Sequence, residues 1–137
     1  MEATVSRVFA DTSGLYAFLV ENDRDHEAAV RAMAELAGER AVLVTTSYVA
    51  HESITLLHRR MGLAAIRAWR GRVEAALEMI WIGREVHESA LTALVASGRR
   101  RVSFTDWTSF EAMRRYRIER AFAFDPDFER EGFETVP

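Results

Sequence analysis

Two acidic residues follow apolar runs of strand length. Asp11 comes directly after Val8–Ala10, and Asp125 comes directly after Ala121–Phe124. Because parallel α/β sheets bind their ligands outside the carboxyl ends of the strands, both side chains are expected at the ligand-binding edge. For Asp11 the alternative is a purely structural role, since aspartate is a favoured N-cap and a short helix is expected to follow.

Glu52 lies in a helical pattern whose apolar positions include Tyr48, Val49 and Leu56. Helical spacing places Glu52 on the same side as these residues, so its side chain should point inward. A buried carboxylate is costly unless a cation or hydrogen-bond donors meet it. Glu52 therefore indicates either a buried ion pair or a functional site.

A fourth acid, Asp106, stands three residues after Ser103. This spacing is typical of a capping box, in which the side chains and backbone amides of two residues pair reciprocally at a helix start. The same position would also bring Asp106 to the edge of the sheet. Asp127, two residues after Asp125, could cap a last helix or add a fifth acid.

The expected chemistry follows from the convergence of these acids at one sheet edge. Carboxylates crowded within about 4–6 Å oppose one another's ionisation, and a bound divalent cation relieves the repulsion. Oxygen ligands favour Mg²⁺, with Mn²⁺ as a substitute. Such an ion lowers the pKa of a bound water and stabilises displacement at phosphorus. The candidate ligands and catalytic groups are Asp11, Glu52, Asp106 and Asp125.

The elements that must position these acids alternate along the chain, which is typical of an α/β domain with a mainly parallel sheet. The expected strands are Arg7–Ala10, Ala41–Thr45, Met79–Ile82 and Ala121–Phe124, with a weak one near Thr135 and Val136. The expected helices are Gly14–Leu19, His26–Leu36, Tyr48–Arg60, Leu63–Leu77, Val86–Ala96 and Asp106–Arg115.

Length and composition exclude several classes of protein. The 137 residues, 49% of them hydrophobic, predict one domain spanning residues 1–137. No membrane-spanning run or secretion signal is apparent, so no membrane association and a cytoplasmic location are expected. The absence of cysteine excludes disulfides and thiolate sites. All 18 basic residues are arginine, which excludes Schiff-base and P-loop lysine chemistry.

The motifs together resemble a PIN domain. They are Asp11-Thr12-Ser13 after the first strand, Glu52 in the third helix, Asp106 with Ser103 before it, and Asp125-Pro126-Asp127-Phe128 after the last long strand. Their layout over nearly the whole chain is similar to the VapC-type toxins of toxin–antitoxin pairs. The resemblance implies a three-layer α/β/α sandwich and an Mg²⁺-dependent endoribonuclease that cleaves RNA with a metal-activated water.

The same resemblance implies roles for particular residues and partners. The four acids would hold the ion, Asp11 and Asp106 most directly, and the other two would complete the cage or orient waters. Thr12 and Ser13 would supply a hydroxyl beside Asp11, and Ser103 is a further candidate on the substrate side. A homodimer and a small inhibitory antitoxin, whose arm lies across the active-site groove, are also implied.

Arginines and tryptophans could contact the RNA. Residues 54–120 carry thirteen arginines against seven acids, although the whole chain has a formal net charge of −3. The triplet Arg99, Arg100 and Arg101 is either a solvated face or a contact for RNA phosphates. Trp107, beside Asp106, is the best candidate to meet an RNA base or an antitoxin, whereas core packing or a dimer face is expected for Trp81.

Two other functions stay open at this point. The acids could be caps and ion pairs of a catalytically inactive PIN-like module that binds RNA or a protein. A metal-dependent phosphatase acting on small molecules would share the cation chemistry. Metal-dependent cleavage of RNA separates the nuclease from both.

Overall fold

The computed structural model describes residues 5–137, whose strands form one five-stranded parallel sheet. The strands are β1 (Arg7–Ala10), β2 (Val42–Thr46), β3 (Leu77–Ile80), β4 (Arg120–Phe122) and β5 (Glu134–Val136). They lie in the order β3-β2-β1-β4-β5, and every neighbouring pair is parallel. The chain therefore builds outward from β1 to β3, and then returns to add β4 and β5 on the other side of β1.

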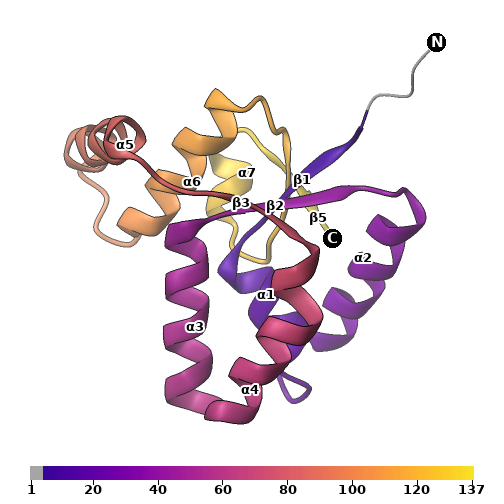
Figure 1. Cartoon of the computed structure of the whole chain (residues 1–137). Helices are drawn as coiled ribbons and strands as arrows, with labels where there is room; N and C mark the ends of the chain where they lie inside the picture. Colours follow the sequence, from indigo (N-terminus) through magenta and orange to yellow (C-terminus); the bar gives the residue numbers. More distant parts are fainter. Residues whose placement is uncertain (1–4) are drawn as a thin grey trace.

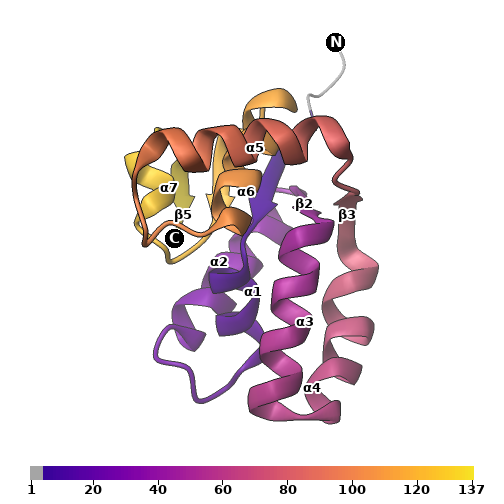
Figure 2. The same ribbon diagram turned by 90° about the vertical axis from the view of Figure 1, so that its left-hand side faces the viewer.

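Helices cover both faces of the sheet. They are α1 (Thr12–Leu19), α2 (His26–Gly38), α3 (Ser47–Met61), α4 (Leu63–Ala68), α5 (Arg84–Ser97), α6 (Phe104–Arg115) and α7 (Asp127–Arg130). Helices α1 to α4 lie on one face and α5 to α7 on the other, as the two views show (Figure 1, Figure 2). The predicted three-layer sandwich is confirmed. Within residues 5–137, none of these helices has both the length and the apolar composition to cross a bilayer.

The place where the strand order reverses, between β1 and β4, is where a ligand is expected to bind. Strands β2 and β3 are added on one side of β1, and strands β4 and β5 on the other side. The carboxyl ends of β1 and β4 therefore flank the topological switch point, which is the usual ligand crevice of an open α/β sheet. Asp11 follows β1 directly, and Asp125 lies three residues beyond the last residue of β4.

The core is centred on β1, where Val8, Phe9 and Ala10 have no exposed surface. A central parallel strand is covered on both faces, which explains its uninterrupted apolar run. Gly14 lets α1 approach β4 closely, because a Cβ at Gly14 would lie 2.5 Å from the carbonyl oxygen of Phe122. This contact brings the start of α1 against the end of β4.

The helix predicted over Leu63–Leu77 ends early. Regular α-helix stops with α4, and the backbone continues as a π turn over Trp69–Val73 and a 3₁₀ turn over Glu74–Ala76. The first and last residues of the π turn are each 1% exposed, so the wider turn keeps both side chains in the core. Strand β3 consequently begins two residues earlier than predicted, and Trp81 lies just beyond it, 78% exposed and outside the core.

Candidate active site

Asp11 is the N-cap of α1 at the switch point. Its Oδ2 accepts hydrogen bonds from the backbone N–H of Ser13 at 3.1 Å and from the Ser13 hydroxyl at 2.6 Å. Its Oδ1 is buried and has no hydrogen-bond partner among residues 5–137. The pKa of Asp11 is raised from 3.8 to about 6, chiefly by burial. The Ser13 hydrogen bonds act in the opposite direction, and the charges of Asp125 and Glu52 add to the rise. A cation or an ordered water would satisfy this buried acceptor.

Ser13 joins the ends of the two central strands. The hydroxyl that donates to Asp11 also accepts from the backbone N–H of Phe124 at 3.0 Å. In addition, the backbone N–H of Asp11 donates to the carbonyl oxygen of Phe122 at 3.1 Å. These bonds hold the segment that leads to Asp125 beside the start of α1.

Asp106 forms the capping box that its spacing indicates. Its Oδ2 accepts from the Ser103 N–H at 3.3 Å, and the Ser103 hydroxyl accepts from the Asp106 N–H at 3.1 Å. The pKa of Asp106 is raised from 3.8 to about 7, chiefly by burial. The charges of Asp11 and Asp125 contribute to the rise, and the Ser103 hydrogen bonds oppose it. Asp106 therefore caps α6 and also belongs to a crowded group of acids.

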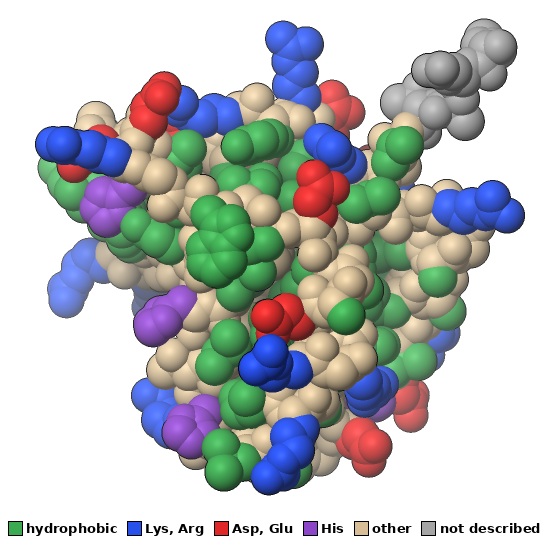
Figure 3. Space-filling view, in the orientation of Figure 1, with side chains coloured by type: hydrophobic (Ala, Val, Ile, Leu, Met, Phe, Trp, Pro, Cys, Tyr) green, Lys and Arg blue, Asp and Glu red, His purple; other side chains and the backbone are tan. Residues whose placement is uncertain are grey.

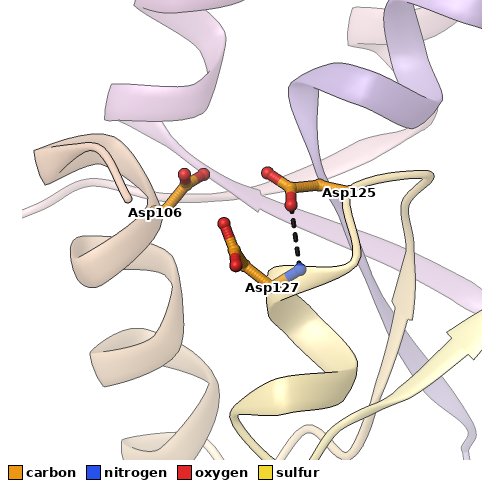
Figure 4. A group of neighbouring side chains, drawn as sticks. All are labelled: Asp106, Asp125 and Asp127. Carbon is orange, nitrogen blue, oxygen red and sulfur yellow. Dashed lines mark hydrogen bonds between the residues drawn. The ribbon is translucent and has the colours of Figure 1, made fainter. Parts of the chain in front are cut away.

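Asp127 completes a group of three carboxylates that could share one ion. One oxygen from each of Asp106, Asp125 and Asp127 lies within 4.8 Å of the others. Figure 4 shows Asp106 projecting from α6 toward the other two, and the Asp127 N–H donating to Oδ1 of Asp125 at 2.9 Å. Burial also raises the pKa of Asp125. The sequence signal for Asp127 is a second acid two residues after the first, with a cap of a last helix as the alternative. A short helix, α7, does form there, but its N-cap is Pro126 and Asp127 is its first residue.

Two arginines partly neutralise Asp127. Its Oδ1 accepts from Arg99 at 3.0 Å and from Arg130 at 2.8 Å. These side chains, with Arg100 and Arg101, line a pocket of about 360 Å³. Arg99 is thus tied to α7, whereas Arg100 and Arg101 are exposed and have no ion-pair partner in the described part of the chain.

Glu52 lies beside the carboxylate group but outside the set of three. It is half-buried on α3 and lines a pocket of about 260 Å³ with Thr105, the residue before Asp106. Its negative charge contributes to the raised pKa of Asp11. The four predicted acids therefore share one electrostatic neighbourhood, although only Asp106 and Asp125 meet the distance for a common ion.

Two residues predicted on the substrate side are buried. The Thr12 hydroxyl accepts from Ser53 at 3.3 Å, so it pairs with α3. Trp107 is 7% exposed and packs edge-on against Phe110, with ring centroids 5.5 Å apart. Helix α6 therefore turns most of the Trp107 ring into the core, and little of it is exposed to an RNA base or a partner.

The donor set fits a hard divalent cation. Asp106, Asp125 and Asp127 offer only oxygen ligands, which favour Mg²⁺ or Mn²⁺ over softer metals. The unpaired Oδ1 of Asp11 adds a buried acceptor beside them. Burial and neighbouring carboxylates raise the pKa values of Asp11 and Asp106 by more than the serine hydrogen bonds lower them.

Comparisons with known proteins agree with this geometry. The PIN domain family model matches residues 8–134. The chain is 36% identical over 130 residues to the "23S rRNA-specific endonuclease VapC20" of two Mycobacterium tuberculosis strains, covering 94% of this chain and 97% of the relative. The crystal structure of M. tuberculosis VapC20, described as a sarcin-ricin loop cleaving toxin, matches with a TM-score of 0.80 at 35% identity, over 92% of this chain and 95% of that one. The chain belongs to the PIN domain family.

Proposed function

We propose that this chain is a VapC-type toxin, an endoribonuclease that hydrolyses RNA phosphodiester bonds with a divalent cation, Mg²⁺ or Mn²⁺. The observation that carries the proposal is the meeting of Asp106, Asp125 and Asp127, with Asp11 beside them, at the switch point of the sheet. The name of VapC20 supports RNA as the substrate. Because that relative is specific for 23S rRNA, a ribosomal RNA loop is the first substrate to test.

The acidic residues of the site have different proposed roles. A bound Mg²⁺ supplies positive charge that favours ionisation of water and offsets negative charge at the phosphodiester. Asp106, Asp125 and Asp127 would hold the ion, and Asp11 would contribute its unpaired Oδ1. We assign Glu52, on the α3 side, to completing the cage or orienting water.

Arginines border the acids in three pockets, which supports a polymeric anion as the substrate. The Arg99–Arg101 triplet lines the pocket with Asp127, Arg59 lines the pocket with Glu52, and Arg60 lines the pocket with Asp125. Contacts from arginine to phosphate position RNA without reading its sequence. On the face seen in Figure 3, arginine side chains are scattered among apolar and acidic ones and do not gather in one patch.

The proposal includes two protein partners. The toxin name of VapC20 supports a cognate antitoxin, and apolar side chains exposed at the end of β3 and on α5 support a homodimer. Trp81 and Val95 are 78% and 76% exposed. Light scattering should give twice the chain mass of 15.6 kDa. A mass of one chain at micromolar concentration would contradict the homodimer.

Cleavage of RNA tests the proposed activity. Purified protein is incubated with a 23S rRNA fragment in Mg²⁺, in Mn²⁺ and in EDTA. We expect cleavage with either ion, none in EDTA, and at least a 100-fold slower rate for Asp106→Asn. Glu35→Gln is the matched control, because Glu35 is exposed on α2 and lines none of the three pockets. Cleavage that persists in EDTA and in Asp106→Asn would refute the proposal.

A further inference from the structure

The pocket that Arg60 shares with Asp125 has a volume of about 360 Å³. Its lining includes Tyr16 from α1, Arg24 from the loop before α2, and Arg60 from α3. Asp125 belongs both to the lining of this pocket and to the group of three carboxylates. The pocket thus combines an aromatic ring and two guanidinium groups with three carboxylates, those of Asp23, Asp25 and Asp125.

Arg60 lies over the ring of Tyr16, and the two stacked side chains form a platform in the lining of this pocket. Tyr16 is half-buried, and the guanidinium carbon of Arg60 lies 5.6 Å from the centroid of its ring. Aromatic rings and arginine planes are the surfaces on which proteins stack unpaired RNA bases. The platform comes from two different helices, so only the folded chain assembles it.

Arg24 supplies a cation at the rim of the same pocket. Its side chain is 93% exposed, and its one ion pair within residues 5–137 is to Asp25 at 3.6 Å. An exposed pair at that distance contributes little and exchanges readily with another anion. Arg24 is therefore free to meet a phosphate.

We propose that this pocket, resting on the ribonuclease function above, binds one unpaired nucleotide of the RNA next to the phosphate that is cleaved. The base stacks on the platform of Tyr16 and Arg60, and Arg24 contacts the phosphate of the same nucleotide. A pocket between α1 and α3 admits a base splayed out of a loop, whereas a base stacked within a duplex does not enter it. The subsite therefore selects single-stranded loops over paired RNA.

Binding to a cleavage-deficient protein tests the subsite apart from the activity. In the Asp106→Asn background, an RNA hairpin carries 2-aminopurine at one loop position at a time. We expect the fluorescence at one position to fall on binding. Tyr16→Leu should abolish that change and weaken affinity about tenfold, whereas Tyr16→Phe keeps both within about twofold. Arg24→Gln should weaken affinity about 3–10-fold and lower the salt dependence, and the exposed Arg31→Gln control should do neither.

The outcomes separate this inference from the proposed function. If the unmodified protein cleaves the hairpin but folded Tyr16→Leu binds as the parent does, the subsite is wrong and the ribonuclease stands. If Tyr16→Leu fails to fold, equal effects of Arg24→Gln and Arg31→Gln overturn the subsite. If the unmodified protein neither binds nor cleaves RNA, the function itself is refuted, and the subsite with it.

Discussion

Ser13 donates its hydroxyl to Oδ2 of Asp11 at 2.6 Å, and so determines that Oδ1 is the oxygen left without a partner. The same hydroxyl accepts from the N–H of Phe124, which leads into Asp125. One side chain thus orients one acid of the candidate site and ties down the segment that carries another. Ser13 acts through these neighbours as a positioning residue.

Removal of this hydroxyl should affect activity more than stability. We expect Ser13→Ala to slow RNA cleavage about 10–100-fold, because Asp11 loses its orientation, and to lower the free energy of unfolding by only about 1 kcal/mol. Ser13→Thr keeps the hydroxyl and should recover most of the rate. Urea melts and cleavage rates measure the two effects. A cleavage rate of Ser13→Ala equal to that of the parent would contradict the positioning role.

The metal-free protein should become less stable as the pH rises from about 4 to about 7. The folded pKa values of Asp11, about 6, and Asp106, about 7, lie above the ordinary 3.8, so the folded state binds more protons in this window. Asp106→Asn removes one of these charges and keeps an acceptor for the Ser103 amide. Its melting temperature in EDTA at pH 8 should exceed that of the parent by about 5–10 °C.

The difference between the two proteins should disappear near pH 4, where the carboxyl groups are protonated. Glu35→Gln, on the exposed side of α2, should have the same melting temperature as the parent at every pH. An Asp106→Asn protein that is less stable than the parent at pH 8 in EDTA would show that the carboxylate charge is compensated within the protein.

Added Mg²⁺ should stabilise the parent protein much more than it stabilises Asp106→Asn. An ion at 100 times its Kd adds about 2.7 kcal/mol to the free energy of unfolding, which corresponds to roughly 10 °C in the melting temperature. Loss of Asp106 from the group of three carboxylates should remove most of this shift. Differential scanning fluorimetry with and without Mg²⁺ measures it. Equal shifts in both proteins would place the ion elsewhere.

Asp127 should matter less for metal binding than Asp106. Its Oδ1 already accepts from Arg99 and Arg130, which offset part of its charge, whereas Asp106 has no ion-pair partner within residues 5–137. We expect Asp127→Asn to weaken Mg²⁺ affinity about tenfold and Asp106→Asn at least 100-fold, as measured by calorimetric titration. Equal losses would contradict this ranking.

Gly14 should tolerate no side chain. A Cβ there would lie 2.5 Å from the backbone oxygen of Phe122, so Gly14→Ala must push α1 away from β4. We expect a loss of about 2–4 kcal/mol in the free energy of unfolding. Gly38→Ala is the control, because its Cβ would meet nothing within 4 Å at the end of α2. A destabilisation at Gly38 as large as that at Gly14 would contradict the steric explanation.

Local features of the fold were readable from the sequence. Asp11 follows an apolar run that is buried on both faces in β1, and the spacing of Ser103 and Asp106 alone predicts the capping box. Both depend on neighbours within a few residues. The π turn over Trp69–Val73 was not predictable in the same way, because it depends on which side chains the rest of the chain buries.

The sequence by itself determined the alternation of strands and helices, the acids at strand ends and helix starts, and the family to which they point. Only the tertiary structure decided that Asp127 joins Asp106 and Asp125, that Trp107 faces the core, and that Arg60 lies over Tyr16. Periodicity reports which residues share a face of one element. Distances between elements depend on how closely they pack, which no spacing along the chain records.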